Sequence, residues 1–399
     1  MPTRINPFIS QVLTDARMVF AIRQWQSFER SILDDDRIGV VYHGDLDGLI
    51  GAAYIGALLK YHLPFSANTL LFWISTDEYD FSSLKKWIAE NNLDKCVFLD
   101  IPLENHNEAL EFISKEVKDN IFIYDHHVVH SHPIELHNVT IVNPSPHGVA
   151  QSEKPLPTFM FAYSIAIDKN IYFPEWLLLL SIFAEGVETF FVSETRNLFQ
   201  SAMGMCVHGS PRDTYRNSLL IKISSLIRAG FASKEKSNVI LYMLHDVMTE
   251  MYVSPESFHQ ALARVFQPIS NEISTMISSV VDYWKDAINT SELKHEKLIV
   301  IELDHPEYSI AGPVASIIRG AFPDKVIAVY DLRDETVVIE IRIQNESTLN
   351  LVQVLDKIAS QLTLINYGGH TSAAGALVSK DDLKSFLNIF EQELLSNGT

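Results

Sequence analysis

The sequence predicts an α/β protein: a mostly parallel β-sheet, then a helical connector, then a smaller α/β domain at the C-terminal end. Three observations support this order. Short apolar runs of strand length alternate with helix-patterned segments up to residue 142. The region 158–285 has a mainly helical pattern, and strand-like runs return near residue 297. Alternating strands and helices favour right-handed crossovers, and these produce parallel sheets.

Five apolar runs in the N-terminal part are candidate strands, and helix-patterned segments separate most of them. We expect the strands at 37–42, 69–75, 95–99, 120–124 and 139–142. We expect the helices at 8–34, 49–60, 81–90 and 103–118. This order is typical of a Rossmann-like sheet, in which ligands collect outside the carboxyl ends of the strands.

The C-terminal part follows a different plan. Residues 254–283 have the pattern of a connecting pair of helices. Further strands are expected at 297–303, 326–330 and 336–343, and further helices at 312–321 and 349–361. The segment 336–343 alternates apolar and polar residues, as a half-buried strand does. We therefore place a first domain at 1–240, a helical linker at 241–289 and a second domain at 290–399.

The composition limits the partners. The chain has 399 residues, of which 47% are hydrophobic, and a formal net charge of −19. Long nucleic acids bind through phosphate neutralisation by Lys and Arg, so this charge disfavours them. A short anionic substrate remains compatible, because bound cations and local charge override the global balance. The N-terminus lacks a signal-peptide pattern and the longest apolar run, near 176–184, is too short for a bilayer, so we expect a cytoplasmic protein without a membrane partner.

Three of the expected strands end in side chains that commonly bind metals. They are His43, Asp45 and Asp47 after the first strand, Asp100 after the third, and Asp125, His126 and His127 after the fourth. Carboxylates crowded at one sheet edge repel one another unless divalent cations bind between them. Mixed carboxylate and imidazole ligands suit Mn²⁺, with Mg²⁺, Fe²⁺ and Co²⁺ as alternatives. Each piece alone is typical of a turn or a helix cap, so the prediction depends on their joint occurrence.

These motifs resemble those of a known family. The runs His43-x-Asp45-x-Asp47-Gly48, Asp100 and Asp125-His126-His127 are similar to motifs I, II and III of the DHH phosphoesterases. Near the C-terminus, Gly368-Gly369-His370 resembles the signature of the DHH-associated C-terminal domain. The resemblance covers nearly the whole chain, although the helical middle part contributes little to it.

The resemblance implies a role for each motif residue. One cation would be held by His43, Asp45 and Asp100. A second would be held by Asp47, Asp100, His126 and an acid from a fourth motif. His127 would face the scissile phosphate, and Asp125 would orient a neighbouring ligand.

The fourth motif departs from the family pattern, which has an Asp after an apolar helix. Here the matching segment, 177–190, offers Glu185, with Glu188 in reserve. A Glu reaches one methylene further than an Asp, so it can coordinate from a slightly withdrawn backbone. Because Glu replaces the usual Asp, both the metal affinity and the activity of this chain need to be tested.

The glycine-rich segment predicts an anion site in the second domain. Gly368 and Gly369 would let backbone N–H groups approach a phosphate, and His370 would donate to it. A helix-compatible run from Ser372 would add the positive end of a helix dipole. Arg342 is the candidate for a second phosphate contact.

The compact two-domain layout resembles that of the family's nanoRNA and dinucleotide phosphodiesterases. The resemblance therefore implies a catalytic first domain, a substrate-binding second domain and the function of a two-metal, Mn-type phosphodiesterase: a hydrolase that activates a water to cleave short nucleotides, either linear dinucleotides or nanoRNA. One alternative is a phosphatase or pyrophosphohydrolase acting on a nucleotide bisphosphate or polyphosphate. A second is a catalytically weakened binding or sensing protein of the same fold, which only the missing fourth-motif Asp favours. The sequence leaves open the exact substrate, exo or endo action, the physiological metal and the oligomeric state, a homodimer included.

Overall fold

Two compact units make up the chain. One comprises residues 1–231 and 235–267, and the other comprises 232–234 and 268–399. The computed structural model describes residues 12–62, 70–75, 81–129, 134–147, 154–169, 171, 173–232, 237–249, 254–290, 292–303, 308–333, 335–344 and 349–396. Each unit contains a five-stranded sheet, which confirms the predicted α/β class. The domain boundaries drawn at residues 240 and 289 stay predictions.

The sheet of the first unit is parallel throughout and has the order β2-β1-β3-β4-β5. Its strands are β1 (Ile38–His43), β2 (Leu70–Ser75), β3 (Lys95–Leu99), β4 (Ile121–Tyr124) and β5 (Val139–Val142). In the register, Leu99 lies opposite both Tyr42 and Tyr124. The residues that follow β1, β3 and β4 therefore emerge side by side at one edge of the sheet.

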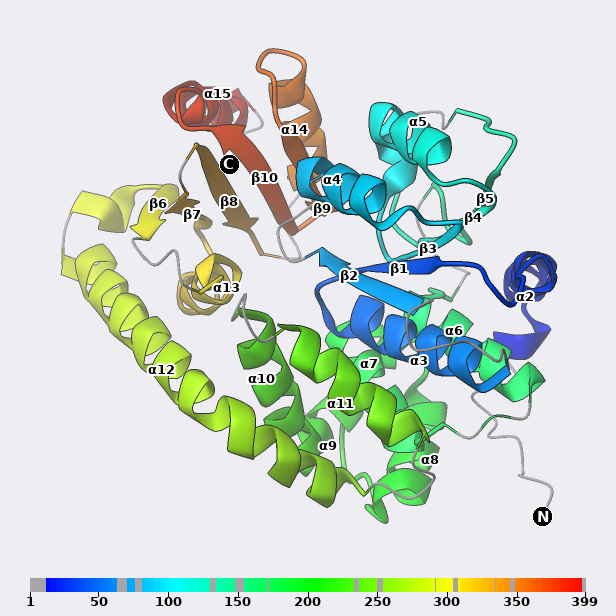
Figure 1. The fold of residues 1–399 in the computed structure, drawn as a ribbon. Helices are drawn as coiled ribbons and strands as arrows, with labels where there is room; N and C mark the ends of the chain where they lie inside the picture. The colour runs from blue at the N-terminus through cyan, green and yellow to red at the C-terminus, as the bar shows by residue number, and fades with distance from the viewer. Residues whose placement is uncertain are drawn as a thin grey trace. The chain divides into compact units, whose positions relative to one another are not determined.

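Helices cover both faces of this sheet (Figure 1). On one face, α4 (Phe81–Asn91) and α5 (Asn107–Glu116) pack through buried side chains such as Leu84 and Ile113. On the other face lie α2 (Ala16–Arg30), α3 (Leu46–His62) and α6 (Thr158–Asp168). The Trp25 ring of α2 meets Phe122 of β4 edge-on, with ring centroids 5.3 Å apart. A sheet covered on both faces explains why its strands read as continuous apolar runs rather than alternating ones.

The remaining described elements of this unit are helical. They are α7 (Glu175–Ala184), the 3₁₀ helix η2 (Val187–Thr189), α8 (Val192–Met203), α9 (Pro211–Arg216), α10 (Leu219–Ala232) and α11 (Ser237–Thr249). A long helix, α12 (Pro255–Thr290), spans residues of both units. The predicted helix pair at 254–283 is therefore wrong. Pro268 lies inside α12 without ending it, although an interior proline removes one backbone hydrogen bond and its ring crowds the carbonyl four residues earlier.

The predicted helix at 103–118 is in fact two elements. The short 3₁₀ helix η1 (Leu103–Asn105) comes first, and α5 begins at Asn107. The backbone of His106, at φ −129° and ψ 66°, interrupts the helical path between them. This break leaves the Glu104 and Asn105 side chains beside the segments that follow β4 and β5, where both take part in the site described below.

The second unit contains a mixed sheet in the order β6-β7-β8-β10-β9. Its elements are the 3₁₀ helix η3 (Glu292–His295), β6 (Leu298–Leu303), α13 (Ala311–Ala321), β7 (Val326–Leu332), β8 (Thr336–Arg342), α14 (Leu351–Ala359), β9 (Asn366–His370), β10 (Ala373–Ser379) and α15 (Leu383–Ser396). Strands β6 and β7 are parallel, and the other pairs are antiparallel. Among the described helices of the whole chain, none combines the length and apolar character that a membrane span requires.

Candidate metal centre

The carboxyl ends of β1, β3 and β4 bring the predicted metal-type side chains into one cluster. Three groups have ligand atoms that all lie within 4.8 Å of one another. They are His43, Asp45 and Asp100; Asp47, His126 and Glu185; and Asp100, His126 and His127. The first group has the same members as one ligand set that the resemblance implies. The second group contains three of the four members of the other set, and the fourth member, Asp100, lies 3.1 Å from His126 Nε2.

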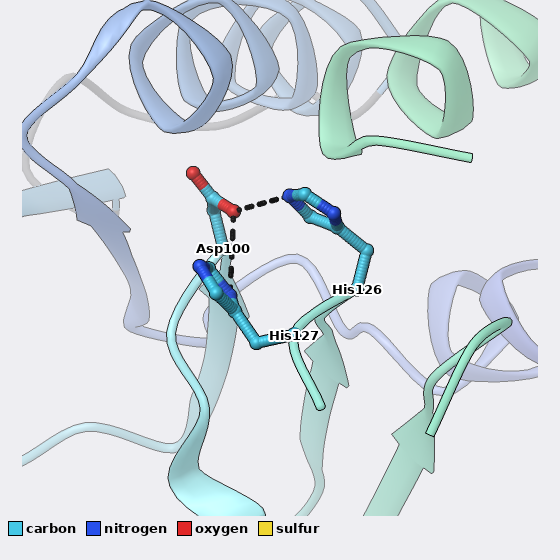
Figure 2. A group of neighbouring side chains, drawn as sticks. All are labelled: Asp100, His126 and His127. Atoms are coloured by element: carbon cyan, nitrogen blue, oxygen red, sulfur yellow. Dashed lines mark ion pairs between the residues drawn. The ribbon is translucent and has the colours of Figure 1, made fainter. Parts of the chain in front are cut away.

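Asp100 lies in the middle of the cluster. Its carboxylate is 3.1 Å from His126 Nε2, 3.9 Å from His127 Nδ1 and 3.7 Å from His43 Nδ1. Figure 2 shows one Asp100 oxygen facing both His126 and His127. The residue has a left-handed backbone, with φ at 63°, which only a few residue types adopt readily. This turn directs the side chain into the cluster directly after β3 ends.

The burial of Asp100 tests whether a cation fits here. Its side chain is 1% exposed, and neither carboxylate oxygen accepts a hydrogen bond of good geometry from the described residues. A buried carboxylate without hydrogen bonds is costly unless a positive group compensates it. Imidazoles and carboxylates together form a donor set that suits a divalent transition metal. The residues present therefore fit bound cations.

Asp45 and Asp47 are held at the start of α3. Gly48 N–H donates to Asp45 Oδ1 at 3.0 Å. Gly48 must be a glycine, because a Cβ there would lie 2.5 Å from the His43 carbonyl oxygen. Asp47 is fully buried, and its two oxygens accept N–H groups of Thr158 (2.8 Å) and Phe159 (2.6 Å) at the start of α6. The Asp47 carboxylate thus caps α6 and still lies 3.3 Å from His126 Nε2.

The fourth acid comes from the end of α7. Glu185 follows the helix directly, and its Oε2 lies 4.0 Å from His126 Nε2. Glu188, the other candidate, instead forms an ion pair with Arg212. The geometry thus brings Glu185 to the cluster and occupies Glu188 elsewhere.

The side chain of His127 is oriented by Asp125, two residues earlier in the chain. Its Nδ1 lies 2.8 Å from Asp125 Oδ1, and its backbone N–H donates to Asp125 Oδ2 at 3.2 Å. A carboxylate can only accept, so Nδ1 carries the proton of this bond and Nε2 points elsewhere. Asp125 itself is fully buried.

The acids of the cluster differ in how tightly they hold protons. Burial raises the pKa of Asp47 to about 6, and the Asp100 charge adds to that shift while His126 opposes it. Burial, followed by the Asp47 charge, raises the pKa of Glu185 well above its usual value. Burial alone would also raise the pKa of Asp100, but the His126 and His43 imidazoles outweigh it and hold that pKa below its usual range.

The imidazoles show the complementary shift. Burial lowers the pKa of His126, but the Asp100 and Asp47 carboxylates outweigh burial and hold it well above its usual value. The same balance, with Asp45 and Asp100, holds the pKa of His43 well above its usual value. Without a cation, the cluster therefore retains extra protons near neutral pH.

These shifts predict a pH dependence of cation binding. A cation must displace protons from groups such as Asp47, His43 and His126, so protonation competes with binding. The apparent Mn²⁺ affinity should rise as the pH rises through 6 and past 6.5, and binding should release protons. Titration calorimetry at about pH 6 and about pH 7.5, in two buffers of different ionisation enthalpy, measures both quantities. An affinity that is flat or falls over this range would contradict the assignment of these residues as ligands.

Two further residues of the site lie in the broken helix and were missed from the sequence. Glu104 is 2% exposed, and burial together with the Asp125 charge raises its pKa to about 8. Asn105 Nδ2 donates to the Val128 carbonyl at 3.1 Å. The sequence did contain a signal, because these two polar residues follow Asp100, the candidate ligand at the end of β3, by only a few positions. The helical pattern of 103–118 hid their position.

The glycine segment of the second unit forms a β-hairpin. Gly368, Gly369 and His370 lie in β9, and Ala373 to Ser379 form β10, so the helix expected from Ser372 is wrong. Ala374, Ala376 and Val378 are buried at every second position, which is the signature of a strand. Gly369 has φ at 133°, and a Cβ there would lie 2.4 Å from the Ala373 carbonyl oxygen, so the hairpin itself requires this glycine.

The phosphate contacts predicted in the second unit stay predictions. Among the described strands, β9 is at the edge of its sheet, and a Cβ on Gly368 would meet open space. The side chain of His370 lies outside the described part of the chain. Arg342 is engaged within its own unit: Nη2 lies 2.8 Å from Glu340 Oε2, and Nη1 donates to the Ile341 carbonyl at 2.9 Å. A phosphate there would have to compete with Glu340.

Comparison with known proteins identifies the class to which this fold belongs. Residues 295–396 match the model of the DHHA1 domain. RecJ from Thermus thermophilus, solved in complex with Mn²⁺, is 17% identical with a TM-score of 0.63; the match covers 96% of this chain and 55% of that one. The chain thus spans about half the length of that RecJ. No curated protein sequence matches the chain.

Two further structures share the fold over almost their whole length. One is the DHH domain of a member of a family of ribosomal proteins, at 17% identity, a TM-score of 0.64, and coverage of 95% of this chain and 91% of that one. The other is an exonuclease RecJ bound to manganese, at 17% identity, a TM-score of 0.60, and coverage of 94% of each chain. The chain therefore has the DHH fold and carries a DHHA1 domain, which confirms the resemblance drawn from its motifs.

Proposed function

We propose that the chain is a metal-dependent phosphoesterase that cleaves phosphodiester bonds of short nucleotides, either linear dinucleotides or RNA of a few residues. One observation carries the proposal: carboxylates and imidazoles from three strand ends and one helix end meet around the buried Asp100 carboxylate. The RecJ structures with this fold hold Mn²⁺ or Mg²⁺, which supports a divalent cation in this chain as well.

In this proposal two ligand sets share Asp100, whose carboxylate lies 3.7 Å from His43 Nδ1 and 3.1 Å from His126 Nε2. His43 and Asp45 would complete one, and Asp47, His126 and Glu185 would complete the other. Bound cations would supply neutralisation of the phosphoryl oxygens and a lowered pKa for an attacking water. The protein's own contribution is positioning and charge stabilisation, which phosphoryl transfer mainly requires.

His127 has a distinct task in this proposal. Asp125 holds its Nδ1 at 2.8 Å and so fixes both the tautomer and the ring orientation. The opposite nitrogen, Nε2, is then directed to donate a hydrogen bond to a phosphoryl or leaving-group oxygen once the imidazole is protonated. Asp125 acts through His127 and makes no contact with substrate.

The choice of a short substrate rests on charge. A net charge of −19 opposes long single-stranded nucleic acid, whereas a dinucleotide needs few neutralising contacts. The second unit would bind the far part of the substrate through Gly368, Gly369, His370 and Arg342. A homodimer and a cytoplasmic location remain part of the same proposal.

A substrate panel tests the proposal. The purified chain with Mn²⁺ is assayed against a linear dinucleotide, a short RNA, a cyclic dinucleotide, a nucleotide bisphosphate, polyphosphate and long single-stranded DNA. We expect release of mononucleotides from the first two, and none without added cation. Cleavage only of the bisphosphate or polyphosphate would favour a phosphatase, cleavage only of the long DNA would overturn the short-substrate assignment, and no cleavage would favour a binding protein.

Variants of the site sharpen this test. Asp125→Ala removes the partner of His127 and should lower kcat by about 10- to 100-fold. Asp47→Ala should reduce the activity further, because it removes a ligand and the cap of α6. If either variant keeps full Mn²⁺-dependent hydrolysis, the assignment of the site is wrong.

A further inference from the structure

Two asparagines hold the loop that carries His126 and His127. Asn143, directly after β5, donates its Nδ2 to the His127 carbonyl at 2.9 Å. Asn105, at the end of η1, donates its Nδ2 to the next carbonyl, that of Val128, at 3.1 Å. Two amides from two different elements thus bind consecutive carbonyls of a single loop.

The Asn143 amide is itself fixed on both sides. Its Oδ1 accepts the Ser145 N–H at 2.9 Å, and its Nδ2 lies 3.4 Å from Glu104 Oε2. The acceptor side therefore faces an N–H group, and the donor side faces a carbonyl and a carboxyl group. This pattern assigns the orientation of the amide, with its donor toward His127.

Two other bonds restrain the same loop at neighbouring points. Val129 N–H donates to the Pro146 carbonyl at 2.8 Å, and Asp125 holds the His127 side chain. The two amides act between these points, on the backbone that joins the His127 ring to Val129. A loop that loses such bonds can shift by a fraction of an ångström, and such shifts are costly where several groups must converge on one phosphate.

We propose that Asn105 and Asn143 are positioning residues, which hold the His126–His127 loop so that both imidazoles keep their places beside Asp100. The proposal rests on the proposed function where it concerns catalysis. It also concerns the loop itself, which can be observed without any substrate. Both residues act through the backbone and do not touch the reacting atoms.

The variants are Asn143→Ala, Asn105→Ala and Asn143→Asp, the last of which keeps the shape of the side chain but loses the N–H donor. The matched control is Asn138→Ala. Asn138 stands just before β5, at its opposite end, where Nδ2 donates to the Ser114 carbonyl at 2.9 Å and Oδ1 accepts from the Ser114 hydroxyl at 2.6 Å. The control thus removes a comparable side-chain–backbone bond at the end of the same strand that lies away from the cluster.

Two readouts separate this inference from the proposed function. The first is the ¹⁵N signals of the His126 and His127 imidazoles, together with amide hydrogen exchange at residues 127–129. We expect the three variants to change these signals and to speed exchange there, whereas Asn138→Ala leaves both unchanged. This readout stands even if the chain hydrolyses nothing.

The second readout is steady-state kinetics on whichever substrate of the panel is cleaved. Asn143→Ala should lower kcat by about 10- to 100-fold with KM nearly unchanged, as the loss of a group supporting a catalytic residue does. Asn138→Ala should keep the kcat of the unmodified chain. If the Asn105 and Asn143 variants behave as Asn138→Ala does in both readouts, the proposal is overturned.

Discussion

Replacing Asp100 with asparagine should lower Mn²⁺-dependent hydrolysis by about a thousandfold or more while the chain stays folded. Asp100 lies within 3.9 Å of three imidazoles, and we propose it as a member of both ligand sets. Losing several kcal/mol of charge stabilisation in the transition state, at about 1.36 kcal/mol for each tenfold change, corresponds to about this factor. Asparagine tolerates the left-handed backbone of this position and has the same shape, so the turn after β3 should survive.

The matched control for this variant is Asp94→Asn. Asp94 lies just before β3, so the two substitutions flank one strand at its opposite ends. Its Oδ2 accepts the Arg37 N–H at 2.8 Å, a role away from the cluster. Asp94→Asn should keep the hydrolytic rate, and circular dichroism should show both variants folded. Near-normal hydrolysis by Asp100→Asn would remove the centre of the proposed site.

Saturating Mn²⁺ should raise the melting temperature of the chain, and a chelator should reverse the rise. In the metal-free cluster, Asp47 and Glu185 have raised pKa values because burial and neighbouring negative charges disfavour their ionised forms. A bound cation favours the ionised forms of both carboxylates, and it can do so only in the folded state, where the cluster exists. At about a hundred times the dissociation constant, linkage adds about 2.7 kcal/mol, which for a unit of this size is roughly 5 °C or more.

Scanning fluorimetry with EDTA, Mn²⁺, Mg²⁺ and no addition measures this shift. Asp100→Asn should show a much smaller rise, because it lacks the carboxylate that the two proposed ligand sets would share. Asp94→Asn should respond as the unmodified chain does. An equal rise in all three proteins would mean that the cation binds elsewhere, and no rise would argue against any cation site.

Much of the first unit was predictable because its sheet is buried on both faces. The runs at 95–99 and 139–142 match β3 and β5 to the residue. Once the strands are located, the residues at their ends are known as well. The parallel register then brings His43, Asp100 and Asp125 to one edge of the sheet. The place of Glu185 also followed from the apolar helix before it, whereas the pairing of Glu188 with Arg212 depends on tertiary contact.

Other features could not be predicted by the same means. A helical pattern over 103–118 does not reveal one residue with a non-helical backbone, so the separate η1 and its Asn105 stayed hidden. In β10, small residues weaken the period-two signal, and the run from Ser372 suits a helix as well as a strand. Tertiary pairing decides between the two, because residues 373–379 pair with β9 on one side and with β8 on the other, after a short turn at residues 371–372.

The capping of α6 by Asp47 also bears on when the proposed cation ligands come together. That bond joins residues 111 positions apart, and Glu185 must then arrive from still further along the chain. Contacts so remote form slowly, after local structure, because a long loop must close first. During synthesis on the ribosome, the complete set of proposed ligands therefore cannot assemble until Glu185, directly after α7, has emerged, so metal loading at this cluster would be a late step in maturation. A truncated chain that ends before α7 should accordingly bind Mn²⁺ weakly, even with its first three motifs intact.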